Sequence, residues 1–310
     1  MDNSSEDFLF VLHGLNDTRT NKQIYFVFTL LLYLLTISVN LTVVAAICLE
    51  KMLHDPMYLF ICSLCVNEIY GASGFYPKLL ADFLSDSQVI SYIGCLMQIF
   101  VIYSYVFCEF TNLTVMAYDR YVAICRPLEY RSIITPWRAG KLLLLTWFIC
   151  LLEAAIMAGL TSTLPICGSD IDKLYCSNVA VVKLACTDTT LNKSFGYILM
   201  IFYISQAIFV VISYIYIVKA SLKSKAGRAK FMQTCLPHLI TLINFTIALI
   251  FDILYSLYGN SHSLYYLRNF LAVDYLIVPP LLNPIIYGMK LTQIRNGLLK
   301  LWGQKIRAVT

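Results

Sequence analysis

The chain has 310 residues, of which 59% are hydrophobic and only 13% are charged. A soluble domain carries about 25% charged residues, so this deficit excludes an ordinary soluble protein and indicates a surface that faces lipid. The formal net charge of +5 is accounted for by basic loops at the membrane and requires no nucleic-acid partner.

Seven apolar segments are each long enough for a membrane helix, which needs about 20 residues. They lie near 24–49, 57–80, 92–118, 142–163, 195–218, 231–258 and 264–288. The segments are continuously apolar and do not alternate, which disfavours a β-barrel. We therefore expect an all-α membrane protein with three parts: a tail over residues 1–23, a seven-transmembrane helix bundle over 24–290, and a short amphipathic helix with a tail over 291–310 on the inner leaflet.

Basic residues concentrate in the loops after the first, third, fifth and seventh segments, most densely within 219–230 and 290–307. The positive-inside rule places these loops in the cytosol and the N-terminus outside. No cleavable signal peptide is evident, because the first residues include Asp2, Glu6 and Asp7 instead of a basic leader. In an outside tail, the sequons at Asn3 and Asn16 are expected glycosylation sites.

Two carboxyl groups, Glu68 and Glu109, fall inside apolar segments. Acids in the hydrocarbon layer must face the bundle interior and find a partner. Two interpretations stay open: neutral, hydrogen-bonded acids, or a shared proton or sodium site that titrates as a coupled pair. Apart from this sodium ion, no cofactor is expected. Asn40, the polar residue of the first segment, is interpreted as an inter-helix hydrogen-bonding group.

Four cysteines, Cys95, Cys167, Cys176 and Cys186, lie in or beside the loops expected outside the cell. The exterior is oxidising, so disulfides are expected, and four cysteines allow three pairings. A zinc site is a weaker alternative, because the spacings fit no compact finger.

Two prolines mark expected irregularities in the last two segments. Pro237 should kink or break its helix. The neighbouring His238 is interpreted as a packing residue, with a proton-sensitive role as the less favoured alternative. Pro284 frees a backbone carbonyl, and we expect Asn283 to restore the lost hydrogen bond.

Two motifs at helix ends carry a family resemblance: Asp119-Arg120-Tyr121 in the third segment and Asn283-Pro284-x-x-Tyr287 in the seventh. Together they resemble the rhodopsin-like class A of G-protein-coupled receptors. Pro56-Met57-Tyr58, the stretch 116–125, Ser213-Tyr214 and the loop with three cysteines look like the odorant receptor family, and the detail is similar to fish-type members. The likeness covers essentially the whole chain.

The resemblance implies disulfides between Cys95 and Cys176 and between Cys167 and Cys186. It implies a buried polar network that includes Asn40, Glu68, Glu109 and Asn283. It assigns activation and G-protein coupling to Asp119, Arg120, Tyr121, Tyr214, His238, Asn283, Pro284 and Tyr287. Glu68 stands where the family more often has aspartate, which puts sodium affinity in question. Thr246 replaces a usual aromatic residue, so the switch in helix six is expected to use Phe245.

A ligand pocket is implied between the outer halves of helices three, five, six and seven. Its expected lining is Ile102, Tyr103, Val106, Phe107, Ile198, Phe202, Leu249, Ile253, Val273 and Leu276. Asp252, Arg268 and Asp274 near the rim would admit a charged group.

The resemblance thus implies a chemosensory receptor in the plasma membrane. It is expected to bind a small-molecule odorant and to activate a heterotrimeric G protein of the stimulatory or olfactory type, which raises cAMP. One alternative is a class A receptor for a peptide or lipid outside olfaction. A second is an ion-coupled transporter that uses Glu68, Glu109 and Glu153. An enzyme is not expected, because no paired nucleophile and base or metal motif is evident.

Overall fold

The structure is a computed structural model that describes residues 8–13, 18–50, 55–223, 225–258 and 265–290. Side chains of residues 226, 227, 230, 233, 234, 237, 252–272 and 288–290 are also outside the description. The predictions for Asn3, Asn16 and 291–310 therefore lie outside the described residues. Those for the side chains of Asp252, Ile253 and Arg268 do so too.

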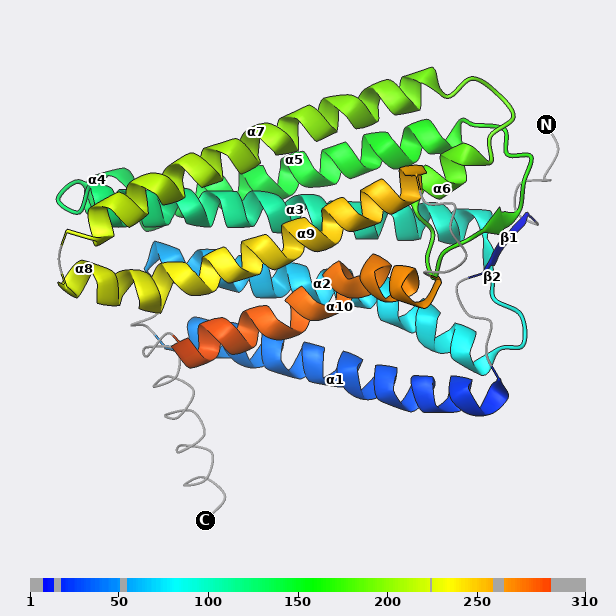
Figure 1. The fold of residues 1–310 in the computed structure, drawn as a ribbon, viewed down its shortest axis with the longest axis horizontal. Coiled ribbons are helices and arrows are strands. Elements are labelled where there is room, and N and C mark those ends of the chain that lie inside the picture. The colour runs from blue at the N-terminus through cyan, green and yellow to red at the C-terminus, as the bar shows by residue number, and fades with distance from the viewer. Residues whose placement is uncertain (1–7, 14–17, 51–54, 224, 259–264, 291–310) are drawn as a thin grey trace, which may run out of the picture.

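Long helices run side by side to form an elongated bundle (Figure 1). In the described chain they are α1 (Arg19–Leu49), α2 (Pro56–Leu84), α3 (Tyr92–Cys125), α5 (Pro136–Ser162), α7 (Thr190–Ser221), α9 (Leu236–Tyr258) and α10 (Tyr265–Lys290). Each predicted apolar segment coincides with one of them. Within the described residues, α1, α3, α5 and α7 are long and apolar enough to cross a membrane. The apolar stretches found in α9 and α10 are shorter, at His238–Phe251 and Val273–Tyr287.

Helix ends extend beyond the apolar segments because polar residues cap them. The Thr18 hydroxyl accepts a hydrogen bond from the Asn21 N–H at 3.4 Å, so α1 begins inside the expected tail. Ser91 caps α3 in the same way through the N–H of Gly94 at 3.1 Å. Pro56 occupies the first turn of α2, where the missing N–H costs nothing.

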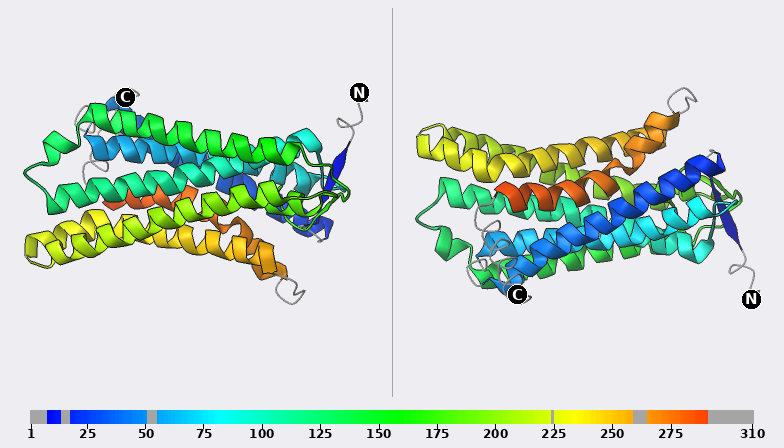
Figure 2. Two further views of the ribbon diagram at one scale, coloured as in Figure 1. Left: turned by 90° about the horizontal axis from the view of Figure 1, so that it is seen from above. Right: turned by 90° about the horizontal axis from the view of Figure 1, so that it is seen from below.

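Short helices mark the two ends of the bundle. Two of them, α4 (Tyr130–Ile133) and α8 (Lys225–Lys230), lie at one end. The third, α6 (Asn178–Lys183), lies at the opposite end, beside the first described N-terminal residues, and the views in Figure 2 agree.

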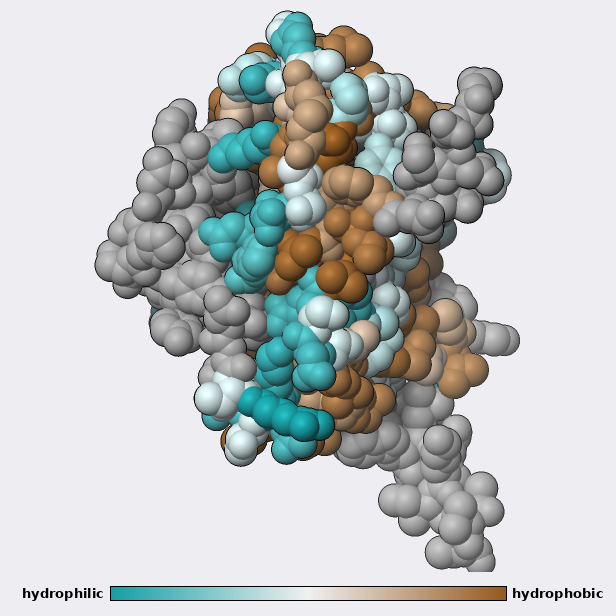
Figure 3. Space-filling view, turned by 90° about the vertical axis from the view of Figure 1, so that its right-hand side faces the viewer, coloured by the Kyte–Doolittle hydropathy of each residue, from teal (hydrophilic) through white to brown (hydrophobic). Residues whose placement is uncertain are grey.

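A three-stranded sheet at the α6 end departs from the expected all-α fold. The strand β1 (Leu9–Leu12) lies between β2 (Val89–Ser91) and β3 (Asp170–Ile171), antiparallel to β2 and parallel to β3. The expected tail thus contributes the central strand. The sequence prediction missed it because three strands of two to four residues carry little periodicity. Seen end-on in Figure 3, hydrophilic residues form a band with hydrophobic patches beside it.

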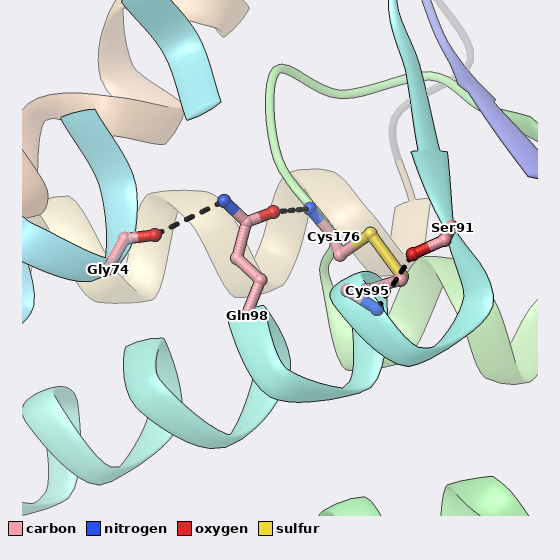
Figure 4. The surroundings of a disulfide bond; sticks show 6 residues. Gly74, Ser91, Cys95, Gln98 and Cys176 are labelled. Atoms are coloured by element: carbon pink, nitrogen blue, oxygen red, sulfur yellow. Dashed lines mark hydrogen bonds between the residues drawn. A yellow bond between two sulfur atoms is a disulfide. The ribbon is translucent and has the colours of Figure 1, made fainter. Parts of the chain in front are cut away.

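Two disulfides hold this end together. Cys95 is bonded to Cys176 and Cys167 to Cys186, the pairing that the family resemblance implies. Gln98 supports the first bridge: its side-chain oxygen accepts from the N–H of Cys176 at 2.9 Å, and its amide donates to the carbonyl of Gly74 at 3.3 Å (Figure 4). The loop 163–189 is therefore tied to both α2 and α3.

Large apolar side chains cover much of the outer surface of α1, α5 and α7. Contiguous apolar surface on this scale is rare on soluble monomers and is expected where hydrocarbon surrounds the protein. The interior is apolar as well, with a main cluster that includes residues from Val43 in α1 to Tyr287 in α10.

The backbone is irregular just before Pro237. Residues Phe231–Cys235 form a π-helical turn that leads into α9. Proline has no N–H to donate to the carbonyl four residues earlier, so the preceding turn cannot close as a regular α-helix. The expected irregularity is present as a π-helical turn on the N-terminal side of the proline.

Candidate functional site

The centre of the bundle contains two acids that touch the same amide. Glu68 of α2 and Glu109 of α3 are fully buried. The Asn283 side-chain nitrogen of α10 donates to Glu68 Oε1 at 2.5 Å and to Glu109 Oε1 at 3.0 Å. The sequence placed these three residues on different segments, and the fold brings them together.

Neutral donors satisfy the other two carboxyl oxygens. Glu68 Oε2 lies 3.0 Å from the Tyr105 hydroxyl, and Glu109 Oε2 accepts from the Asn67 amide at 3.1 Å. In the described part of the chain, neither acid forms an ion pair with a basic residue. Two bare negative charges in so apolar a place would be very unfavourable, so the pair must hold a proton or a cation.

Gly71 allows Tyr105 to reach this network. A Cβ atom at position 71 would lie 2.4 Å from the Tyr105 ring, which is far closer than atoms can pack. The glycine therefore lets α2 and α3 approach until the Tyr105 hydroxyl meets Glu68. Neither Tyr105 nor Asn67 was among the predicted site residues, although both are polar groups within apolar segments.

Prolines in α10 free two carbonyls, and polar side chains of other helices lie against both. Pro284 cannot bond the carbonyl of Pro280, and the Asn40 amide of α1 donates to that oxygen at 2.7 Å. Pro279 likewise cannot bond the carbonyl of Tyr275, and the Tyr105 hydroxyl lies 3.0 Å from it. The expectation that Asn283 repairs the proline break is thus wrong. Asn40 does so, because the Asn283 amide is occupied by the two acids.

A line of tyrosines connects the disulfide-bonded loop to the acids. Tyr175, next to Cys176, is almost fully buried, and its hydroxyl lies 2.8 Å from that of Tyr275 in α10. The carbonyl of Tyr275 contacts Tyr105, which contacts Glu68. Phe245 of α9 packs edge-on to Tyr105 and Tyr275, each with ring centroids 6.4 Å apart. Direct contacts therefore link the loop to the acids.

The C-terminal end of α3 contains a buried ion pair. Arg120 donates from Nε to Asp119 Oδ2 at 2.9 Å and makes a second bond to the same oxygen from its guanidinium. The hydroxyl of Tyr130 in α4 donates to the other Asp119 oxygen at 2.8 Å. Both members of the pair are buried, so removing either one would leave the other as an unpaired buried charge, which is strongly destabilising.

Among the other predicted activation residues, Asn283 lies with the two acids, and the structure describes the surroundings of Tyr121, Tyr214, His238, Pro284 and Tyr287 as follows. The Tyr214 hydroxyl of α7 contacts His238 Nδ1 and lies 3.4 Å from the carbonyl of Cys235 in the π-helical turn. His238 is thus a buried, partnered residue, in line with the favoured interpretation. Tyr287 is buried, and Tyr121 packs edge-on to Tyr216. Pro284 is buried in α10.

Comparison with known proteins identifies the family. The family model described as "Olfactory receptor" matches residues 28–305. Human olfactory receptor 4S2 is 33% identical over 304 residues, covering 96% of this chain and 95% of the relative. Human olfactory receptor 6N1 is 37% identical over 285 residues, with 89% of each covered, and mouse olfactory receptor 2C1 is 32% identical with 98% of each covered.

The chain belongs to the olfactory receptor family. Olfactory receptors are multi-pass plasma-membrane receptors that bind odorants and couple to G proteins. This receptor is accordingly a chemosensory G-protein-coupled receptor and not an enzyme.

The predicted ligand-pocket residues of the receptor separate into two groups. On α3 and α10, Ile102, Val106, Phe107, Val273 and Leu276 are buried in the bundle. Tyr103 on α3 and Leu249 on α9 are half-buried, and Asp274 is half-buried on α10.

The two predicted residues of α7 do not face the interior. Ile198 and Phe202 have 63% and 40% of their surface exposed, so their assignment to the pocket is wrong. The inward stripe contains Leu199 and Tyr203, one residue further along. A shift of one residue turns a side chain by about 100° around the helix, which carries it from the bundle to the lipid. Leu199, Val210, Tyr214 and Ile217 are buried and Tyr203 is half-buried, but α7 is apolar on its other faces as well, so the sequence carried no clear signal for this stripe.

Tyr203 is a site residue that the sequence reasoning missed. Its ring stacks on Phe107 of α3 with centroids 5.1 Å apart and an interplanar angle of 13°. Its hydroxyl donates to Glu153 of α5 at 2.6 Å. Glu153 thus has a neutral partner, and the pair links α5 and α7 beside the predicted pocket residue Phe107.

Proposed function

We propose that the receptor spans the membrane seven times, binds a small odorant in the outer half of its bundle, and activates a stimulatory G protein that raises cAMP. In this proposal the N-terminus is extracellular and the end that carries α4 and α8 is cytosolic. The observation that carries the proposal is the chain of contacts from Tyr175 through Tyr275 and Tyr105 to Glu68. These contacts connect the loop that contains Tyr175 to the buried acid pair, Glu68 and Glu109.

The orientation is supported by charge at the two ends. Exposed basic side chains gather at the end with α4 and α8, among them Arg131, Lys219, Lys223, Lys225 and Arg228. An excess of Lys and Arg in short loops marks the cytosolic side. The disulfides lie at the opposite end, as an oxidising exterior requires.

The odorant is proposed to contact Tyr103, Val106 and Phe107 on α3, with Tyr203 completing the wall from α7. This wall is apolar and aromatic, with hydroxyl groups as the polar contacts, which is the common composition of small-molecule sites. An odorant that moved Tyr275 would change the packing around Phe245, whose ring contacts those of both Tyr105 and Tyr275.

Sodium is proposed as an inhibitory ion at the acid pair. Hard cations prefer oxygen ligands, and Glu68 and Glu109 present carboxylates side by side. The Asn67 side-chain oxygen is buried next to them and has no hydrogen-bond partner among the described residues. It is a third oxygen suited to the ion. A bound ion would hold α2, α3 and α10 together, so its release accompanies activation.

The output step is proposed to be release of Arg120 from Asp119 together with an outward swing of α9. The π-helical turn before Pro237 is a local irregularity at which α9 can bend. Tyr214 holds this turn to α7 in the resting arrangement. Once freed, the Arg120 guanidinium can bond the G protein.

A ligand screen followed by two substitutions tests this function. Cells that report cAMP would be exposed to volatile and water-soluble small molecules, including acids and amino acids. With an agonist found, Arg120→Ala should abolish the cAMP response at unchanged surface expression. Arg126→Ala is the matched control, because Arg126 is an exposed arginine at the end of the same helix. A full response from Arg120→Ala would overturn the proposal.

A further inference from the structure

An apolar groove separates α7 from α9 in the half of the bundle near α8. Its volume is about 620 Å³, within the range of about 300–1,000 Å³ typical of ligand sites. Residues of both helices line it, including Ala207, Val211, Tyr214 and Lys219 of α7 and Ile243 and Ile247 of α9. Val211 and Ile247 are largely exposed, so the groove opens on the outer surface of the bundle.

The length of the groove matches one leaflet of a membrane. Its α7 wall extends from Ala207 to Lys219. Twelve residues of α-helix span about 18 Å. The hydrocarbon core is about 30 Å thick, so one leaflet contributes about 15 Å. The groove therefore runs from the membrane surface at Lys219 to about the midplane at Ala207.

Positive charge lies at the surface end of the groove. Lys219 itself lines the groove, and no ion pair or hydrogen bond is found for its side chain within the described residues. Lys223, Lys225 and Arg228 follow it, are exposed, and belong to a stretch, 219–230, that contains no acidic residue. An apolar channel with a basic mouth is complementary to a molecule with an acyl chain and an anionic headgroup.

We propose that this groove binds an anionic phospholipid of the cytosolic leaflet, with one acyl chain between α7 and α9 and its phosphate on Lys219. The choice of leaflet rests on the orientation proposed above. The site is separate from the odorant site, because it opens to the lipid and lies on the cytosolic side of Phe110, which lines its inner wall. The acyl chain would lie against Tyr214, the residue that contacts His238 and Cys235.

Native mass spectrometry of the purified full-length receptor tests the site. The receptor would be taken from nanodiscs of phosphatidylcholine that contain a minor fraction of phosphatidylserine. Lys219→Gln should weaken retention of phosphatidylserine about fivefold, the expected effect of one basic residue near the surface. Val211→Trp should fill the groove and abolish retention.

Two matched variants control for general effects. Ile212→Trp places the same bulk on the next residue, which is similarly exposed but does not line the groove. Lys141→Gln removes a basic residue of α5 that lies over the Trp137 ring, away from the groove. Both should retain phosphatidylserine like the unmodified receptor. Equal loss in groove and control variants, or no loss in either, would overturn the proposal.

A second measurement needs no substitution. Phosphatidylserine with a diazirine in its acyl chain, photolysed in nanodiscs with the unmodified receptor, should label residues of 207–219 and 239–247. Uniform labelling of all lipid-facing helices would refute a defined site. Neither assay uses an odorant or a G protein, so both can be interpreted even if the odorant screen fails. Antibody access to an N-terminal epitope on intact cells tests the orientation separately.

Discussion

Replacing Tyr130 with Phe tests whether the Asp119–Arg120 pair restrains the receptor. The Tyr130 hydroxyl donates a 2.8 Å hydrogen bond to the Asp119 oxygen that Arg120 leaves free. Burial and the neighbouring Asp119 carboxylate raise the pKa of Tyr130, so its hydroxyl stays protonated and donates at neutral pH. The substitution removes this bond and keeps the ring.

The size of the effect follows from the position of the bond. A hydrogen bond to a charged group contributes about 1.5–3 kcal/mol. Tyr130 is only half-buried, so solvent screening reduces this to about 1 kcal/mol. If the bond exists only while Asp119 holds Arg120, its loss shifts the equilibrium toward the released state about fivefold. Ligand-independent signalling should rise by up to that factor.

The assay is basal cAMP, normalised to receptor at the cell surface, for the unmodified receptor, Tyr130→Phe and Tyr216→Phe. Tyr216 is a suitable control, because it is 54% exposed on α7 and its hydroxyl has no hydrogen bond within the described residues. Tyr216→Phe should leave the basal signal unchanged. A basal signal in Tyr130→Phe that equals or falls below that of the unmodified receptor would refute the reasoning.

Three further predictions concern the network and the corrected face of α7. Glu109→Gln should remove the dependence of agonist potency on sodium, measured with choline as the replacement cation; a persisting sodium shift would exclude an ion at the acid pair. In a double-mutant cycle of thermal unfolding, Tyr175→Phe and Tyr275→Phe should show a coupling free energy of about 1 kcal/mol, because their hydroxyls lie 2.8 Å apart. Additive losses of stability in the double variant would mean that this contact contributes nothing. Leu199→Ala should lower the free energy of unfolding of the purified receptor by about 2–5 kcal/mol, and Ile198→Ala by much less, because only Leu199 is buried. Similar losses in the two variants would show that Ile198 is buried in the bundle as well.

Local properties of the sequence were sufficient for the elements and for part of the site. Apolar runs of membrane length predicted the helices, since lipid leaves no alternative for an unbroken apolar segment. The same constraint predicted that Glu68 and Glu109 face the interior, and the structure joins them through Asn283. Pro237 marked the irregular turn before α9, because a missing N–H disrupts a helix wherever it occurs.

Properties that depend on how helices rotate and meet came only from the tertiary structure. Ile198 and Leu199 are equally apolar, and packing alone decides that Leu199 is buried and Ile198 is exposed. Tyr105 reaches Glu68 only because Gly71 lets two helices approach. The carbonyl freed by Pro284 accepts a bond from Asn40, 240 residues distant in the sequence. Sequence alone therefore determined that buried acids, and backbone carbonyls freed by proline, must find hydrogen-bond partners within the bundle. The tertiary structure decided which residues satisfy them, because hydrogen bonds act over about 3 Å and their partners depend on the contact geometry.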